Sequence, residues 1–202
     1  MTVQRRQAVR FGRKARGILS IVAGLACTTA IAHAQAAPPV AQQMVGTWNV
    51  RQRMWPGSGL RAIELPAAIA HRRLVGGTFL EEVMETVPGS KQPFTRVAYF
   101  NYNAVNRQYE YFSLDTRAPQ MMSEKSNGAV ASSDTNGRGA ILLNGGTFVA
   151  PQWGQARDVP FRYRLVLDPI QHDRQLVRLY LTPRSGKNTA EFLAFEYAYT
   201  KR

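Results

Sequence analysis

The sequence predicts an all-β protein, a single up-and-down antiparallel β-barrel of about ten strands. Three observations lead to this prediction. Apolar and polar residues alternate with a period of two along many short segments, turn residues recur every eight to twelve residues, and no amphipathic helix of useful length is present. Closing the sheet into a barrel removes strand edges that would otherwise pair with other chains.

The first 34 residues have the features of a secretory signal peptide. Six basic residues lie between Arg5 and Arg16 with no acidic residue among them, an apolar run follows over residues 18–26, and Ala32-His33-Ala34 is a small-x-small cleavage pattern. The apolar run is too short to span a bilayer comfortably. We therefore predict cleavage after Ala34, a periplasmic or secreted location, and no transmembrane segment in the mature chain.

Two other export routes compete with simple Sec-dependent cleavage. Arg5-Arg6 is a twin-arginine pair, but the bulky residue expected after such a pair is missing, so the Sec and twin-arginine routes both stay open. Cys27 would be the acylated residue of a lipoprotein. We disfavour that alternative because Gly24 stands where a branched aliphatic residue is expected and because a good cleavage site lies downstream.

The charge of the mature chain is smaller than the total of +13 suggests. Without the six leader residues, 20 basic and 13 acidic residues remain, a net charge of +7, and no cysteine is left to form a disulfide. The basic residues alternate singly along predicted strands, as in Arg162-Tyr163-Arg164, instead of clustering with aromatic residues. This pattern is typical of solvated strand faces, so we expect no nucleic-acid partner.

The mature chain is expected to hold a short lead over residues 35–45, with one helical turn at 40–45, and one barrel domain over residues 46–202. Asn144-Gly145-Gly146 is a hairpin signal between two of the expected strands. The clearest strands are the last three, each with one strongly apolar face. The expected strands cover residues 47–55, 68–75, 78–86, 94–102, 108–114, 121–126, 140–143, 147–150, 161–168, 176–181 and 192–199.

Several motifs resemble known β-barrel families. Gly46-Thr47-Trp48 is similar to the G-x-W that opens the first strand of lipocalin-like, or calycin, barrels. The run GGTFLEE at residues 76–82 resembles the G-G-x-F-L-E-E core of the bacterial domain-of-unknown-function family 1579. Segments 102–109 and 197–202 resemble its strand-turn-strand and closing strand, although Tyr102-Asn103 departs from the family's Tyr-Asp. The resemblance covers about residues 44–202 and implies a lipocalin-like barrel without a settled activity.

The same resemblance implies a role for Trp48. In lipocalin-like barrels the tryptophan closes the barrel floor against a cation from the last strand, here Lys201 or Arg202. We favour this structural role over stacking on a ligand.

The hairpin at Gly76-Gly77 supplies the charged candidates. A two-residue turn would pair Val75 with Thr78, and would therefore set Arg72 opposite Glu81 and His71 opposite Glu82, on opposite faces. We expect Arg72 and Glu81 to point inward, where they could hold an anionic group. The His71–Glu82 pair is the alternative, as an acid/base dyad.

These residues define the functional hypotheses. The first is a periplasmic barrel that binds a small apolar or amphipathic, possibly anionic, ligand; its predicted contacts are Arg72, Glu81, Trp48, Phe79, Tyr163 and Tyr197. The second is an isomerase or hydrolase that uses His71 and Glu82, and the third is an envelope interaction module with a filled barrel. We expect no cofactor and no metal, because the mature chain has only two histidines and no metal-binding spacing. Binding is preferred over catalysis, and the oligomeric state stays open.

Overall fold

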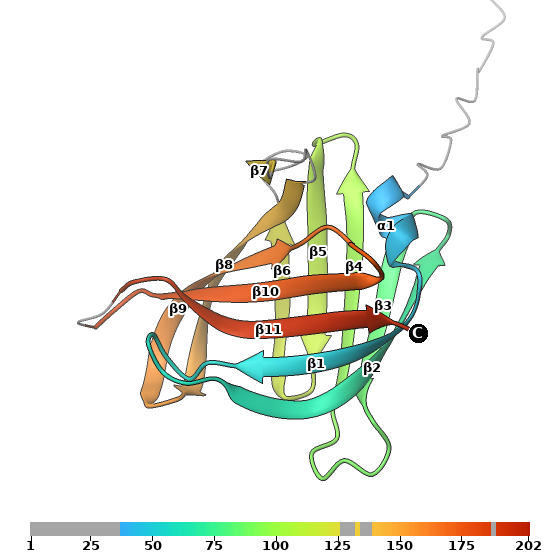
Figure 1. Cartoon of the computed structure of the whole chain (residues 1–202). Helices are drawn as coiled ribbons and strands as arrows, with labels where there is room; N and C mark the ends of the chain where they lie inside the picture. Colours follow the sequence, from blue (N-terminus) through green and yellow to red (C-terminus); the bar gives the residue numbers. More distant parts are fainter. Residues whose placement is uncertain (1–36, 126–131, 134–138, 187–188) are drawn as a thin grey trace, which may run out of the picture. The chain divides into compact units, whose positions relative to one another are not determined.

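The computed structural model describes residues 37–125, 132–133, 139–186 and 189–202. The predicted signal peptide, its cleavage site and Cys27 lie outside the described residues. Within them, antiparallel strands form a closed ten-stranded barrel, with a short helix at one end and an additional two-residue strand (Figure 1). The predicted fold class and strand number are therefore confirmed.

The strands follow one another around the barrel in chain order. Most barrel strands pair with their neighbours in sequence; β1 also pairs with β11, and a short β6–β8 pairing closes the sheet. The tiny β7 lies beside β8. The bounds are α1 (Pro39–Met44), β1 (Gly46–Met54), β2 (Ile63–Val75), β3 (Phe79–Thr86), β4 (Thr95–Asn103), β5 (Gln108–Asp115), β6 (Ala118–Lys125), β7 (Ser132–Ser133), β8 (Gly139–Trp153), β9 (Ala156–Leu167), β10 (Arg174–Pro183) and β11 (Phe192–Lys201).

The two ends of the barrel differ. At the helix end, α1 lies near the β2–β3 turn, and the Ala37 amide donates to the Gly77 carbonyl at 2.9 Å (Figure 1). Pro39 suits the first helical position, where no amide donor is needed. At the opposite end, called the mouth end, the β1–β2, β8–β9 and β10–β11 connections come together (Figure 1). Helix α1 therefore covers one end and leaves the other to loops.

The β2–β3 register differs by one residue from the prediction. Gly76, Gly77 and Thr78 form a three-residue turn, so that Val75 pairs with Phe79. Both glycines have positive φ, 60° and 71°, which glycine tolerates without strain. Because a one-residue slip moves every side chain to the other face, the predicted Arg72–Glu81 and His71–Glu82 pairs are wrong.

The predicted hairpin at residues 144–146 is also wrong. Strand β8 continues through residues 144–146 without a turn, and its register to β9 shifts between Asn144 and Thr147. The ring of Tyr163 on β9 lies where a Cβ on Gly145 would stand. The two glycines therefore form an irregularity within one strand, a known use of glycine inside strands, while the true turn follows Trp153.

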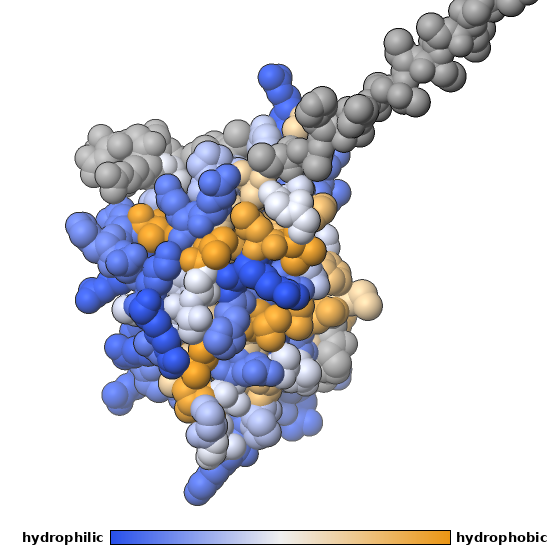
Figure 2. Space-filling view, turned by 90° about the vertical axis from the view of Figure 1, so that its right-hand side faces the viewer, coloured by the Kyte–Doolittle hydropathy of each residue, from blue (hydrophilic) through white to orange (hydrophobic). Residues whose placement is uncertain are grey.

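Side chains of the barrel itself fill the inside. The apolar faces predicted for the last three strands point inward over most of their length: Phe161, Tyr163, Leu165, Leu167, Val177, Leu181, Phe195, Tyr197 and Tyr199 are buried. Leu193 is an exception, because the register between β10 and β11 shifts after Leu179 and sets Leu193 opposite Tyr180. The outer wall is not uniformly hydrophilic, and Figure 2 shows apolar patches between hydrophilic residues on the face that lies on the right of Figure 1. Phe79 is 47% exposed. Its apolar character alone therefore did not decide the face on which it lies.

Candidate functional site

A buried ion network occupies the barrel interior. Arg72 on β2 lies opposite Glu82 on β3, and its Nε donates to Glu82 Oε2 at 2.7 Å. Arg96 on β4 donates to the other carboxylate oxygen at 2.6 Å, and the Tyr199 hydroxyl donates to that same oxygen at 3.2 Å. Arg72 also donates to Gln175 Oε1 at 2.8 Å. One carboxylate thus holds two buried guanidinium groups.

The environment keeps Glu82 ionised. Burial disfavours the charged form and acts to raise the pKa of Glu82, but the attraction of Arg72 and Arg96 and the hydrogen bonds outweigh it and lower the pKa below its ordinary value. The side chains of Arg72, Arg96 and Glu82 are only 2%, 6% and 7% exposed. A charged group so deep in the barrel is tolerated only because it is paired.

Aromatic rings enclose the two arginines. The Arg72 guanidinium carbon lies 3.9 Å from the Tyr199 ring centroid and 5.2 Å from that of Trp48, while Arg96 lies 5.2 Å from the Tyr197 ring. The void beside this cluster is about 20 Å³, room for about one water molecule. The interior around Arg72 is therefore packed by the protein's own side chains.

The two charged pairs predicted from the sequence, Arg72–Glu81 and His71–Glu82, are not formed in the structure. Glu81 points outward, where it binds Arg73 at 2.5 Å and accepts from the Tyr99 hydroxyl at 2.9 Å. His71 is exposed, lies opposite Val83, and shares a 3.2 Å hydrogen bond with Thr47. The proposed acid/base dyad does not form, because His71 and Glu82 lie on opposite faces of the sheet.

The predicted closing role of Trp48 matches the geometry. Trp48 is fully buried, and its Nε1 donates to the Met44 carbonyl at 2.8 Å. Lys201 lies 5.4 Å from its ring centroid, as the resemblance implied, and Arg72 adds a second cation from inside the barrel. Trp48 therefore links α1, the first strand and the closing strand.

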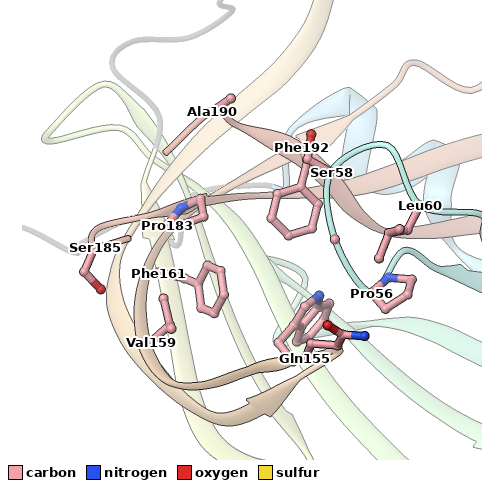
Figure 3. A pocket seen from close by; sticks show the side chains of 12 residues that line it. Pro56, Ser58, Leu60, Gln155, Val159, Phe161, Pro183, Ser185, Ala190 and Phe192 are labelled. Carbon is pink, nitrogen blue, oxygen red and sulfur yellow. The ribbon is translucent and has the colours of Figure 1, made fainter. Parts of the chain in front are cut away.

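A separate apolar pocket opens at the mouth end, with a volume of about 270 Å³ (Figure 3). Three connections contribute to it: the β1–β2 loop, the β8–β9 hairpin and the β10–β11 connection. Figure 3 shows the rings of Phe161 and Phe192 beside the space, opposite Pro56 and Leu60. The described lining residues are Pro56, Gly57, Ser58, Leu60, Trp153, Gln155, Val159, Phe161, Pro183, Ser185, Ala190 and Phe192.

Close loop packing holds one side of this pocket. The indole Nε1 of Trp153 donates to the Trp55 carbonyl at 3.0 Å, and the Trp55 amide donates to the Ala194 carbonyl at 2.9 Å. Gly154, at φ +59°, approaches the Pro56 backbone so closely that any Cβ would overlap it. The β8–β9 hairpin and the β1–β2 loop are thereby fixed against each other.

The chemistry of the mouth pocket suits an apolar body. None of its described lining residues is charged, and the polar ones are limited to Ser58, Gln155 and Ser185. None of the residues predicted to bind a ligand lines it, and their role in binding stays a prediction. The sequence signal that could have led to the pocket is the placement of Trp55-Pro56 and Trp153-Gly154, bulky and turn-forming residues at the ends of strands.

The described part of the chain, residues 37–125, 132–133, 139–186 and 189–202, was not found to hold a metal site or a membrane-spanning helix. No group of three or more His, Cys, Asp and Glu side chains there is arranged to hold a metal ion. No helix among those residues is long and apolar enough to cross a membrane.

The fold and the pocket define a closed ten-stranded antiparallel β-barrel with a packed interior and an apolar mouth. The chain belongs to the family described as "Protein of unknown function (DUF1579)", whose model matches residues 35–199. The resemblance stated from the 76–82 run is thereby confirmed. No curated protein matches the chain.

A solved structure supports the fold independently. The crystal structure of Rv2717c from M. tuberculosis is similar over 82% of this chain and 99% of its own, with a TM-score of 0.52 and 16% sequence identity. At this identity the similarity concerns the fold alone.

Proposed function

We propose that this protein is an exported β-barrel that binds a small apolar or amphipathic molecule in the mouth pocket. The observation that carries the proposal is the apolar pocket of about 270 Å³ between three loops, lined by Trp153, Phe161 and Phe192. Small-molecule sites are typically concave and mostly apolar, with a few polar groups. This pocket has that composition, and its volume of about 270 Å³ suits a small molecule.

The proposed ligand lies at the mouth of the barrel and not in the interior, where the sequence-based hypothesis placed it. Arg72 and Arg96 already share Glu82, and the void beside them holds no more than a water molecule. An anionic ligand there would have to displace a buried carboxylate from two guanidinium groups. The mouth pocket needs no such displacement. Because the proposed ligand lies at the mouth, a filled interior is compatible with ligand binding. The filled interior therefore does not by itself favour the envelope interaction module over a binding protein.

Export is part of the proposal and has its own test. It is supported by the basic residues, the apolar run and the Ala32-His33-Ala34 pattern in the first 34 residues. Intact-mass analysis of the protein from an envelope fraction should give a mature species that begins at Gln35. A species that begins with an acylated Cys27 would instead identify a lipoprotein, and an uncut chain would contradict cleavage.

The binding test uses N-phenylnaphthylamine, a neutral dye that fluoresces in apolar sites. Val159→Trp places a larger side chain in the pocket and should abolish saturable dye binding, with thermal melting used to confirm that the variant is folded. The matched control is Val105→Trp, in the β4–β5 turn at the helix end, where Val105 is 91% exposed. Equal dye binding by both folded variants, or no saturable binding by the unchanged protein, would refute the proposed site.

A further inference from the structure

Aromatic rings form one wall of the mouth pocket. Phe161 on β9 and Phe192 at the start of β11 are an edge-to-face pair, with ring centroids 6.5 Å apart and ring planes at 74°. Figure 3 shows both rings beside the space. Trp153, at the end of β8, adds an indole to the lining. Aromatic rings attract one another in offset-stacked and edge-to-face arrangements, so a wall with rings in two orientations favours an aromatic ligand over a saturated one.

Packing behind this wall holds its rings in place. Phe161 lies 5.9 Å from Phe148, centroid to centroid, and Phe148 lies 5.7 Å from Tyr163. Phe161 and Tyr163 are buried members of an apolar cluster, and Trp153 and Phe192 are partly buried and pack against it. The wall is therefore the outer side of a packed cluster, and its rings are fixed before any ligand arrives.

The wall opposite the rings is stiff as well. Figure 3 shows Pro56 and Leu60 across the space from Phe161 and Phe192. The ring of Pro56 has no rotamer freedom to lose, and the close approach of Gly154 holds its backbone in place. A pocket that is fixed on both sides suits a rigid ligand, because a flexible chain would lose conformational freedom on entering it.

From these observations we propose that the ligand of the mouth pocket is a rigid aromatic molecule of about two fused rings. This inference rests on the proposed function. A cavity of about 150 Å³ takes up one benzene ring, so the volume of about 270 Å³ suits about two. The polar lining residues Ser58, Gln155 and Ser185 carry neutral hydroxyl and amide groups. A hydroxyl substituent fits this lining, whereas a charged group inside the pocket would lose its hydration without a partner.

The test compares two alcohols with the same carbon skeleton, 2-naphthol and decahydro-2-naphthol, as competitors for bound N-phenylnaphthylamine. Each favourable ring pair increases an affinity about two- to tenfold, so 2-naphthol should displace the dye at a concentration at least about fivefold lower. The saturated alcohol has the larger apolar surface, so burial of area alone predicts the opposite order. This comparison is made in the unchanged protein and needs no variant.

A variant then tests the wall itself. Phe192→Leu keeps an apolar side chain and removes one ring, so it should reduce the preference for 2-naphthol at least about threefold. Its affinity for decahydro-2-naphthol should change about twofold or less. Phe79→Leu, on β3 at the helix end, is the matched control, because Phe79 is 47% exposed and lies outside the pocket lining. It should keep the preference, and thermal melting confirms that both variants are folded.

The failures of the two proposals are distinguishable. If the saturated alcohol displaces the dye as well as 2-naphthol does, and dye binding is still lost in Val159→Trp, the aromatic ligand is overturned and the pocket stays in place. A full preference that persists in folded Phe192→Leu would overturn the aromatic ligand too. If the dye does not bind saturably, the proposed function fails together with this inference.

Discussion

The ring of Tyr163 lies over Gly145 on the inner side of the barrel wall and reaches the backbone of Ser123 beyond it. Its hydroxyl accepts from the Ser123 amide and donates to the Ser123 carbonyl, both at 3.2 Å. This contact joins β9 to β6 across β8. It supports the weakest seam of the barrel, where β6 and β8 share only the pairs Glu124–Gly145 and Lys125–Asn144.

Gly145→Ala should destabilise the barrel, because the new methyl group would overlap the Tyr163 ring and push it away from Ser123. Overpacking and lost hydrogen bonds together predict a cost of about 2–4 kcal/mol in chemical denaturation. Gly146→Ala is the matched control, since nothing lies within 4 Å of its added Cβ, and it should cost less than about 1 kcal/mol. Similar costs for both variants would contradict the role assigned to Tyr163.

Glu82→Gln should be strongly destabilising, because it leaves two buried guanidinium groups without their carboxylate. Breaking a buried ion pair on one side costs about 3–5 kcal/mol. The neighbouring variant Glu81→Gln is the control. The Glu81 side chain is 12% exposed, but that of its partner Arg73 is 75% exposed, so that solvent reaches the pair. Ion pairs that solvent screens contribute about 0–1 kcal/mol. A denaturation experiment that ranked Glu81→Gln as the costlier change would show that the faces are assigned wrongly.

Glu124 should make the stability of the barrel depend on pH. It is 1% exposed, its Oε2 has no hydrogen-bond partner among the described residues, and burial raises its pKa to about 8 although Arg96 acts to lower it. The folded protein keeps this proton above the ordinary pKa of 4.5, where the unfolded chain has lost it. The stabilisation that comes from the retained Glu124 proton is therefore complete below the ordinary pKa of 4.5 and is lost as the pH rises through about 8.

Glu124→Gln should remove this dependence. Relative to the unchanged protein, the variant should gain on the order of 3 kcal/mol in unfolding free energy between about pH 5 and pH 9. Urea denaturation at about pH 5, 7 and 9 measures the effect. Glu85→Gln, an exposed change on β3, should leave the pH profile as it is. Parallel profiles for all three proteins would mean that Glu124 is ionised in the folded state at neutral pH.

Trp48→Ala should cost about 3–5 kcal/mol, because it removes a fully buried ring and leaves a cavity between α1 and the closing strand. Lys201→Met keeps the packing and removes only the cation 5.4 Å from the ring, so it should cost about 1 kcal/mol or less. Thermal and chemical denaturation of the two variants separates packing from charge. A near-neutral Trp48→Ala would disprove the closing role.

The strands and the fold class follow from the sequence because a period of two is a local property. The alternation at residues 161–167 and 195–199 identified the inner faces of β9 and β11 without knowledge of their partners, and it failed at Leu193, where a register shift between β10 and β11 interrupts the period. The Gly46-Thr47-Trp48 motif and the 76–82 run led to the family in the same local way.

Tertiary structure decided which charges face inward and where a ligand can lie. The turn after Val75 holds three residues, and that single step put Glu82 inside and Glu81 outside. Gly145-Gly146 became part of one strand because a ring from β9 needs the space, a contact between residues distant in sequence. The mouth pocket joins residues from the stretches 56–60, 153–161, 183–185 and 190–192. No local pattern brings these stretches together, because the pairing of β1 with β11 is what makes their loops neighbours.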